Sequence, residues 1–144
     1  ISQGPGEFVY LADTWNSRVQ QFSPDLFAQS EWPVKAWDGT SINNKPFVAV
    51  DSVDRVYITD PEGYRVLIFN SDGTYIGRFG SFGSGPGELG LPNGIAVDAE
   101  DNIYIADAGN NRILKFASPF AAGAQPEVES LPVEEGEGYP AEGE

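Results

Sequence analysis

The sequence contains no cysteine, no histidine and no methionine. Without cysteine, the chain can form neither a disulfide bond nor a thiolate metal site, and it gives no indication of its redox compartment. Without histidine, it lacks the usual general base and the commonest ligand of zinc, copper and iron. Because the missing methionine includes an initiator, we expect the 144 residues to be a fragment or a processed product.

Long apolar runs and basic residues are also scarce. No apolar run reaches the roughly 18 residues of a membrane span. No stretch shows a sustained 3.6-residue apolar period, so we expect almost no helix. The chain has 8 Lys and Arg against 22 Asp and Glu, a net charge of −14. Residues 1–118 hold all 8 bases and 15 of the acids, a net of −7. Since an acidic surface repels phosphate backbones, nucleic acid is not an expected partner.

Turn-forming and aromatic residues, in contrast, are plentiful. The chain has 17 Gly and 11 Pro, with nine Phe, six Tyr and three Trp. Frequent turns between aromatic and β-branched runs are typical of an all-β protein of short strands.

Three segments of the chain align without gaps, VYLADTWNSRVQQF at 9–22, VYITDPEGYRVLIF at 56–69 and IYIADAGNNRILKF at 103–116. An Asp, an Arg and a Phe recur in them at a constant spacing of 47 residues. Three coincident series at one period indicate a repeat architecture. The recurring residues are Asp13, Asp60 and Asp107; Arg18, Arg65 and Arg112; and Phe22, Phe69 and Phe116.

Each repeat is predicted to hold four short strands, a to d. Strand a is FVAVD or GIAVD, strand b is VYITD or IYIAD, and strand c is RVLIF or RILKF. NSDGT at 70–74 predicts a hairpin turn into strand d. Four-stranded units of about 40–50 residues predict the blades of a β-propeller.

The segment GSGPGELGLPNGIAVDAEDNIYIADAGNNRILKF at 83–116 closely resembles the NHL repeat. That repeat has a Gly/Pro-rich linker, then Pro-x-Gly-Ile-Ala-Val-Asp, Asn-Ile-Tyr-Val-Ala-Asp, an Asn-Arg-rich turn and an apolar strand. The similarity is good over 45–80 and partial over 8–37. The chain is thus identified with three consecutive, partly truncated NHL repeats. The resemblance implies a β-propeller, usually with six blades.

The register divides residues 1–118 into blades at about 1–44, 45–90 and 91–118. It places strand a of the first repeat before Ile1 and ends the third repeat after strand c, which gives ten strands. Six blades need roughly 280 residues, so the chain is expected to form about half a ring. An open arc leaves blade faces uncovered. Missing blades of the same polypeptide, a second copy or a capping partner could cover them, and we favour the first.

Residues 119–144 are rich in Pro, Gly and Glu and poor in large apolar residues. This composition cannot bury enough surface to fold alone, so we expect a flexible, acidic tail. Docking of the tail on a basic partner is a less favoured role.

The Asp and Arg of each repeat flank the b–c turn, where a hairpin brings its two ends together. We therefore expect a carboxylate–guanidinium contact in each blade, Asp13–Arg18, Asp60–Arg65 and Asp107–Arg112. A feature repeated in every blade is expected to be structural, because a single active site is not repeated.

The tips of the b–c turns differ between repeats and should lie on one mouth of the propeller, together with the d–a linkers. Loops on a rigid scaffold often carry binding residues, and aromatic residues are good contacts. The candidate ligand-binding residues are Trp15, Asn16, Tyr64, Asn110 and Asn111. The alternative, which we favour, is that these side chains pack on adjacent linkers.

Two pairs of carboxylates, Asp51/Asp54 and Asp98/Asp101, lie in the expected a–b turns. Calcium favours such oxygens, but the dense spacing of a calcium loop is absent, so we expect turn capping and no metal site. The Gly-rich stretch 80–90 is expected to link two blades, because no Lys-Ser/Thr and no helix follow it as in a phosphate loop.

The resemblance to NHL propellers suggests three kinds of function: an enzyme, an RNA-binding protein or a binding scaffold. The lyases of similar fold rely on histidines, which this sequence lacks, and RNA-binding members present a basic face, which it also lacks. We expect a non-catalytic binding or scaffold module for a protein, peptide or glycan, outside the cytosol or at a cell surface, without a cofactor. The alternative is a segment of a calcium-dependent hydrolase or lactonase-like propeller, in which calcium would be the cofactor.

Overall fold

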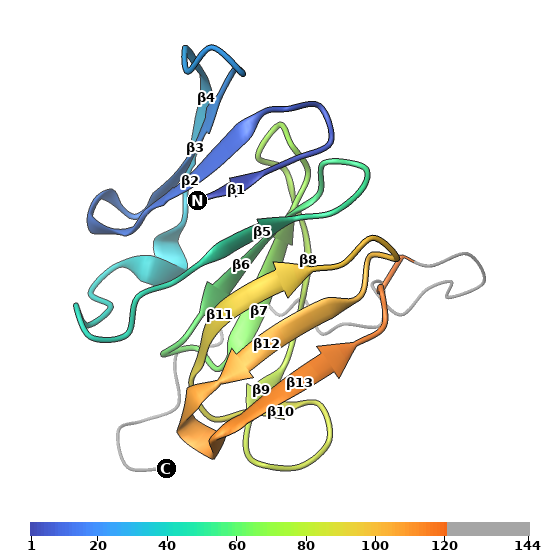
Figure 1. Ribbon diagram of the computed structural model, residues 1–144. Helices are drawn as coiled ribbons and strands as arrows, with labels where there is room; N and C mark the ends of the chain where they lie inside the picture. The colour runs from blue at the N-terminus through green and yellow to red at the C-terminus, as the bar shows by residue number, and fades with distance from the viewer. Residues whose placement is uncertain (121–144) are drawn as a thin grey trace.

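The computed structural model describes residues 1–120, which form three successive antiparallel sheets (Figure 1). The first contains β1 (Ser2–Gln3), β2 (Val9–Asp13), β3 (Arg18–Phe22) and β4 (Ala28–Pro33). The second contains β5 (Val48–Val50), β6 (Val56–Asp60), β7 (Arg65–Phe69) and β8 (Tyr75–Phe79). The third contains β11 (Pro92–Val97), β12 (Ile103–Asp107) and β13 (Arg112–Phe116).

Each sheet is a meander in which neighbouring strands are consecutive in the chain, and each is one blade of a propeller arc. Strand β5 contacts both β1 and β11, so the first strands of the blades lie side by side on the inside of the arc. The linker after blade 2 contains a short parallel pair, β9 (Ser81–Phe82) with β10 (Glu88–Leu89). The helical content described is three 3-10 turns, η1 (Thr14–Asn16), η2 (Lys35–Trp37) and η3 (Ala108–Asn110).

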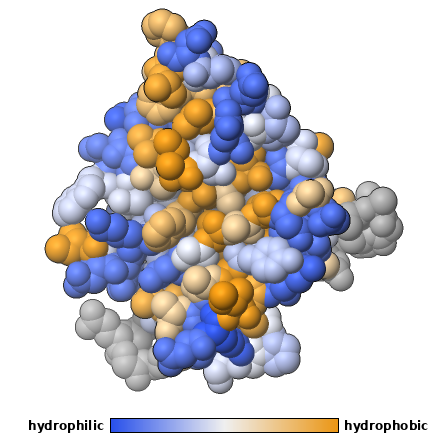
Figure 2. Space-filling model, viewed as in Figure 1, coloured by the Kyte–Doolittle hydropathy of each residue, from blue (hydrophilic) through white to orange (hydrophobic). Residues whose placement is uncertain are grey.

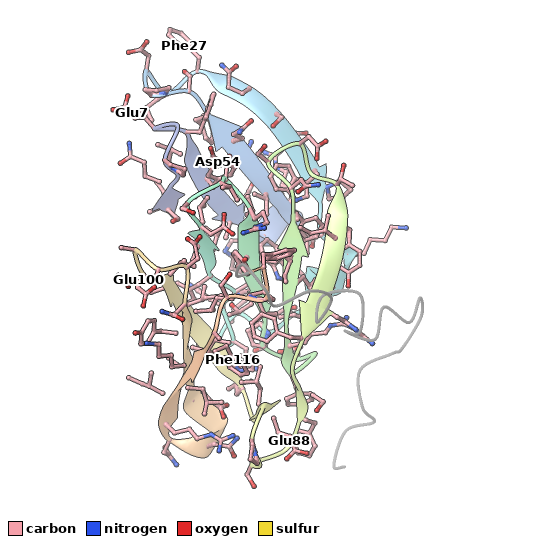
Figure 3. The ribbon with its side chains drawn as sticks, turned by 90° about the vertical axis from the view of Figure 1, so that its right-hand side faces the viewer. Glu7, Phe27, Asp54, Glu88, Glu100 and Phe116 are labelled. Atoms are coloured by element: carbon pink, nitrogen blue, oxygen red, sulfur yellow. The ribbon has the colours of Figure 1, made fainter. Side chains whose placement is uncertain are left out.

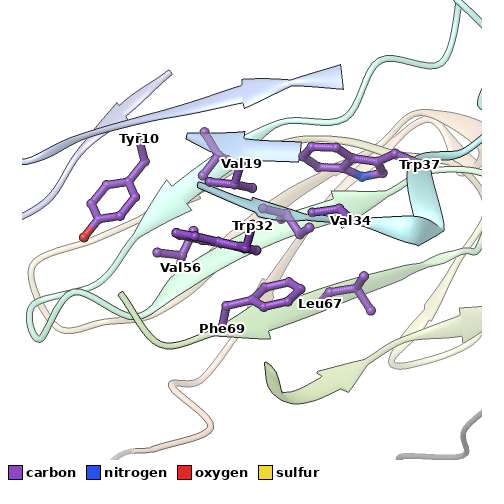
Figure 4. Packing of buried hydrophobic residues seen from close by; sticks show 10 residues of the cluster. Tyr10, Val19, Trp32, Val34, Trp37, Val56, Leu67 and Phe69 are labelled. Atoms are coloured by element: carbon purple, nitrogen blue, oxygen red, sulfur yellow. The ribbon is translucent and has the colours of Figure 1, made fainter. Parts of the chain in front are cut away.

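Strand alternation gives each blade two apolar faces, and these faces pack blade against blade. Between blades 1 and 2, Tyr10 and Val19 meet Val56, Leu67 and other apolar side chains of one cluster (Figure 4). Between blades 2 and 3, the opposite face of blade 2 meets Ile103 and Ile105. Burial of apolar area between blades is therefore the main stabilising contribution to the arc.

The 47-residue period extends to backbone conformation. The a–b turns place a residue of positive φ, 62° each time, at Glu7, Asp54 and Asp101. The b–c turns do the same at Ser17, Tyr64 and Asn111, with φ of 47°, 55° and 53°. Left-handed residues of this kind tighten a turn, and their recurrence means that the three blades share the conformation of both turns. The a–b turns follow one another from blade to blade, as Glu7, Asp54 and Glu100 show (Figure 3).

The fold corrects three expectations. Strand a of blade 1 does not lie before Ile1, because β1 pairs Gln3 with Val9 as β5 pairs Val50 with Val56. Its sequence, Ile-Ser-Gln, lacks the apolar pattern that marks the other first strands. The described strands number thirteen rather than ten, since β1, β9 and β10 are two-residue strands without a sequence signal. Finally, the folded part continues past residue 118, because Phe120 packs against the second core cluster.

The expected tail, 119–144, otherwise lies outside the described residues. Within residues 1–120, no helix is long and apolar enough to cross a membrane.

The outer face of blade 3 is uncovered by the described residues. Ala96 and Ile113 are exposed there, whereas the matched residues of blade 2, Ala49 and Val66, are buried against blade 3. Ile113 is 75% exposed. Apolar atoms are visible over β11–β13 on the side that faces the viewer (Figure 2). This face has the character of a blade interface, not of a solvated sheet surface.

Candidate binding cleft on the b–c face

The expected Asp–Arg contact is present in each of the three blades. The distance from Arg Nε to Asp Oδ2 is 2.7 Å for Arg18–Asp13, 2.7 Å for Arg65–Asp60 and 3.0 Å for Arg112–Asp107. The two residues are direct cross-strand partners in every case. Register and turn length thus place the charges together, and the pair closes the b–c hairpin.

Asp107 also holds the linker that precedes its blade. Its Oδ1 accepts hydrogen bonds from the backbone N–H of Gly90 and Leu91, at 2.7 and 3.1 Å. Burial acts to raise the pKa of Asp107, but the hydrogen bonds from Asn110, these two N–H groups and Arg112 outweigh it and hold the pKa below its usual value. The pKa of Asp13 is lowered chiefly by its bond from Arg18.

Two candidate binding residues pack on linkers, as the favoured alternative expects. The Tyr64 ring meets the Phe82 ring edge-on, with centroids 4.6 Å apart, in the linker between blades 2 and 3. Asn110 Nδ2 donates to the Gly83 carbonyl at 2.8 Å and to Asp107 Oδ2 at 2.7 Å. Both side chains are therefore engaged by the chain itself.

Two further candidates serve their own turns. Asn16 Nδ2 donates to both carboxylate oxygens of Asp13, each at 3.0 Å. Asn111 takes the left-handed position that ends η3, and its N–H donates to the Ala108 carbonyl.

Trp15 is the remaining candidate, and it lines a cleft of about 220 Å³. The side chain is 75% exposed at the tip of η1. The linker between blades 1 and 2 supplies most of the remaining lining, and the buried Trp37 side chain forms its floor. The lining residues are Thr14, Trp15, Ser17, Trp37, Gly39, Thr40, Ser41, Ile42, Lys45 and Pro46.

Both the floor and the linker wall are held by hydrogen bonds. Trp37 Nε1 donates to the Thr59 carbonyl at 3.0 Å, which fixes the indole over strand β6. Glu62 Oε1, in the b–c turn of blade 2, accepts from Ser41 N at 2.8 Å and Asn44 Nδ2 at 3.0 Å. The cleft is therefore largely formed before a ligand arrives, which lowers the ordering cost of binding.

The carboxylates of the a–b turns are engaged within the fold. Asp51 accepts from Arg55 Nε at 2.6 Å and Tyr57 Oη at 3.0 Å, besides two backbone N–H groups. Asp98 caps the next turn in the same way, and the hydrogen bond from Asn102 lowers its pKa most. Asp101 binds Ser52 N and Oγ, at 2.8 and 2.6 Å, and thereby joins blade 3 to blade 2.

Turn capping is thus what Asp51 and Asp98 do, while Asp101 adds a contact between blades. Asp54 reaches the Tyr10 hydroxyl of blade 1 at 3.5 Å. Over residues 1–120, no group of three or more Asp, Glu, His or Cys side chains is arranged to hold a metal ion.

Sequence reasoning missed most of the cleft. Lys45, Thr40 and Ser41 lie in a linker without a repeat signal, and Glu62, which holds that linker, lies at a b–c tip that differs between repeats. One signal was available in the register: Ser17 is a small residue at the position that Tyr64 fills in the next repeat.

Fold and repeat together define the class of protein, a β-propeller of which the chain forms an arc of three blades. Residues 46–120, just over half of the chain, match the family described as a 6-bladed beta-propeller. The chain belongs to this family. No curated protein matches the sequence.

Solved lyase structures share the fold. The chain is similar to selenomethionine-substituted virginiamycin B lyase from Staphylococcus aureus, with a TM-score of 0.55, 14% identity, and coverage of 83% of this chain and 40% of the lyase. A catalytically inactive histidine-to-alanine variant of that lyase, with quinupristin, has a TM-score of 0.55 and 14% identity, over 81% of this chain and 40% of the lyase. A streptogramin B lyase has a TM-score of 0.52 and 12% identity, over 83% of this chain and 40% of the lyase. The chain spans about two fifths of these enzymes, and at such identities the likeness concerns the fold alone.

Proposed function

We propose that the chain is a non-catalytic binding module whose ligand, a protein, peptide or glycan, occupies the cleft beside Trp15. The observation that carries the proposal is an exposed indole on the wall of a cleft whose other parts are fixed by hydrogen bonds. Tryptophan is costly to leave in water and is enriched among the residues that dominate binding energy.

The module is also proposed to be part of a larger ring. The three blades are NHL repeats within a six-bladed ring, and further blades of the same polypeptide, or of a second copy, complete it. We place the ring outside the cytosol or at a cell surface, with no cofactor and no nucleic acid partner. The acidic balance of 15 acids to 8 bases in residues 1–118 supports the last point.

A second candidate is a segment of a propeller enzyme, and the fold shared with the lyases favours it. One of these lyases is catalytically inactive when a histidine is replaced by alanine, and the 144 residues of this chain contain no histidine. A calcium-dependent hydrolase or lactonase-like propeller is the form of this candidate that needs no histidine. Calcium should then raise the melting temperature of the protein, and no shift would count against it.

The experiment that tests the binding module is a panel of glycans and peptides probed with the wild-type protein, Trp15→Ala and Phe27→Ala. Phe27 is a matched control, because it is 70% exposed but does not line the cleft. At least one ligand should bind the wild type and Phe27→Ala and lose most of its affinity for Trp15→Ala. Ligands that bind all three proteins equally, or no ligand at all, would contradict the proposal.

A further inference from the structure

The cleft lies where blade 1 has a small residue, Ser17, at the repeat position that Tyr64 takes in blade 2 and Asn111 in blade 3. Between blades 2 and 3, Tyr64 of the b–c turn meets Phe82 of the following linker and fills the space between them. Ser17 stands at the matched position of blade 1, with φ of 47° against 55° for Tyr64. Both residues thus take the left-handed conformation that ends the b–c turn, and the short serine side chain leaves the adjoining space open.

The lining combines indole rings with hydroxyl groups. Trp15 supplies an exposed flat apolar face, and Thr14, Ser17, Thr40 and Ser41 each bring a hydroxyl that can donate and accept. A volume of about 220 Å³ is below the usual size of a site for drug-sized ligands, about 300 Å³ or more. A pyranose ring matches this lining, because it pairs an apolar C–H face with a rim of hydroxyls and suits a small cleft.

The charge of the cleft is opposite to that of the chain. Lys45 is the one charged residue of the lining, no carboxylate lines it, and the chain as a whole carries −14. Within residues 1–120, Lys45 is exposed and forms no ion pair. An ammonium left without a carboxylate partner, on an otherwise acidic protein, is suited to a ligand that brings its own carboxylate.

We propose that this cleft binds an acidic sugar, a pyranose ring that carries a carboxylate, as in the uronate units of an oligosaccharide. The ring packs on Trp15, its hydroxyls bond to the hydroxyl side chains, and its carboxylate pairs with Lys45. This inference rests on the proposed binding function and assigns the ligand class of the same site.

An acidic peptide is the competing occupant, and the geometry favours it less. Extended peptides commonly bind by adding a strand to an open sheet edge, where backbone hydrogen bonds supply affinity. The walls of this cleft are a 3-10 turn and a linker, not a strand edge. The lining thus offers side-chain hydroxyls rather than a ladder of backbone groups.

The test is isothermal titration of the 144-residue protein with three probes: trigalacturonate, its neutral methyl ester and triglutamate. Trigalacturonate should bind about tenfold more tightly than its ester, since one charge-assisted pair is lost. Lys45→Met should remove that difference, and Lys35→Met, an exposed lysine outside the lining, should keep it. Ser17→Tyr should fill the cleft, as Tyr64 fills the space beside Phe82. Binding of both sugars should then be abolished, while the melting temperature stays near that of the wild type.

Other outcomes separate the two proposals. Equal binding of the acid and its ester, or an unchanged preference in Lys45→Met, would overturn the acidic assignment and leave the binding cleft standing. Triglutamate binding that depends on Trp15 would make the ligand a peptide and also overturn the sugar. If none of the three probes binds, the sugar assignment is wrong, and the glycan and peptide panel with Trp15→Ala then decides the binding function separately.

Discussion

At the scale of single residues, the aspartate of each Asp–Arg pair has a role that depends on its surroundings. In blade 3 it is fully buried and holds both Arg112 and the linker at Gly90 and Leu91. In blade 1 the matched Asp13 is partly exposed and contacts its own turn. The same repeat residue therefore contributes different amounts to stability.

Substitution of these aspartates should separate the two settings. Asp107→Ala leaves a guanidinium and two backbone N–H groups without their carboxylate, and we expect a loss of about 3 kcal/mol in the free energy of unfolding. Asp13→Ala, in the more exposed pair, should cost about 1 kcal/mol or less. Urea denaturation measures both, and equal losses would contradict the difference in burial.

The pH dependence of stability follows from the same groups. The pKa values of Asp13, Asp98 and Asp107 lie below the usual 3.8 in the folded protein. Their stabilisation is therefore complete above the unfolded-state pKa and is lost as pH falls through the lower folded-state values. With no histidine in the chain, little change is expected between about pH 6 and 8.

Urea midpoints from about pH 7 to about pH 3 should therefore stay level and then decline below about pH 4. The decline should be shallower in Asp107→Ala, which has lost one of the groups. A urea midpoint that rises as pH falls would contradict the stabilisation expected from these lowered aspartate pKa values.

At the scale of elements, the left-handed residues show which turn positions are under strain. The c–d turn of blade 2 has Gly73 at φ 87°, where glycine is at ease. The matched residue of blade 1 is Leu26, at φ 64° and 67% exposed. A leucine in this conformation costs free energy, and its side chain gains little burial in return.

Leu26→Gly should therefore stabilise the protein by about 0.5 to 1 kcal/mol, because the relief of left-handed strain exceeds the entropy cost of glycine. Thermal unfolding measures the change as a higher melting temperature. Phe27→Ala, at the neighbouring exposed position, is the control and should leave the melting temperature nearly unchanged. A lower melting temperature for Leu26→Gly would mean that the leucine makes a contact of its own.

The strands and contacts that recur in each repeat were predictable from the sequence, whereas the short strands and the linker contacts were not. The b and c strands, their turns and the pairing of Asp with Arg follow from a period that the sequence repeats three times. Strand β1 and the pair β9–β10 were not predicted, because two-residue strands have no pattern of their own. The cleft was only partly predictable, since Trp15 stands in a repeat but Lys45 and Thr40 stand in a linker whose path depends on tertiary contacts.

At the scale of the whole molecule, the arc is incomplete for its family. The chain spans 40% of the lyases of similar fold, and the outer face of blade 3 exposes Ile113 where blade 2 buries Val66. A blade obtains much of its stability from its two neighbours. We therefore expect this face to be covered by another blade.

The 144-residue chain alone should consequently associate through this face. Sedimentation velocity should show species heavier than the 15.5 kDa monomer as concentration rises. Ile113→Asp places a charge on the apolar face and should shift the distribution towards monomer, whereas Phe27→Asp, at an exposed position of blade 1, should not. A wild-type chain that remains monomeric and does not aggregate would contradict the expectation.

The central claim is that an acidic sugar binds in the cleft beside Ser17, and the three tryptophans test it most directly. Trp15 and Trp37 line the cleft, whereas Trp32 is buried between blades 1 and 2 and does not. In a ¹⁵N-labelled sample, titration with trigalacturonate should shift the indole N–H signal of Trp15 most, shift that of Trp37 less, and leave that of Trp32 in place. Unchanged signals at saturating sugar, or a shift of Trp32 alone, would contradict the account.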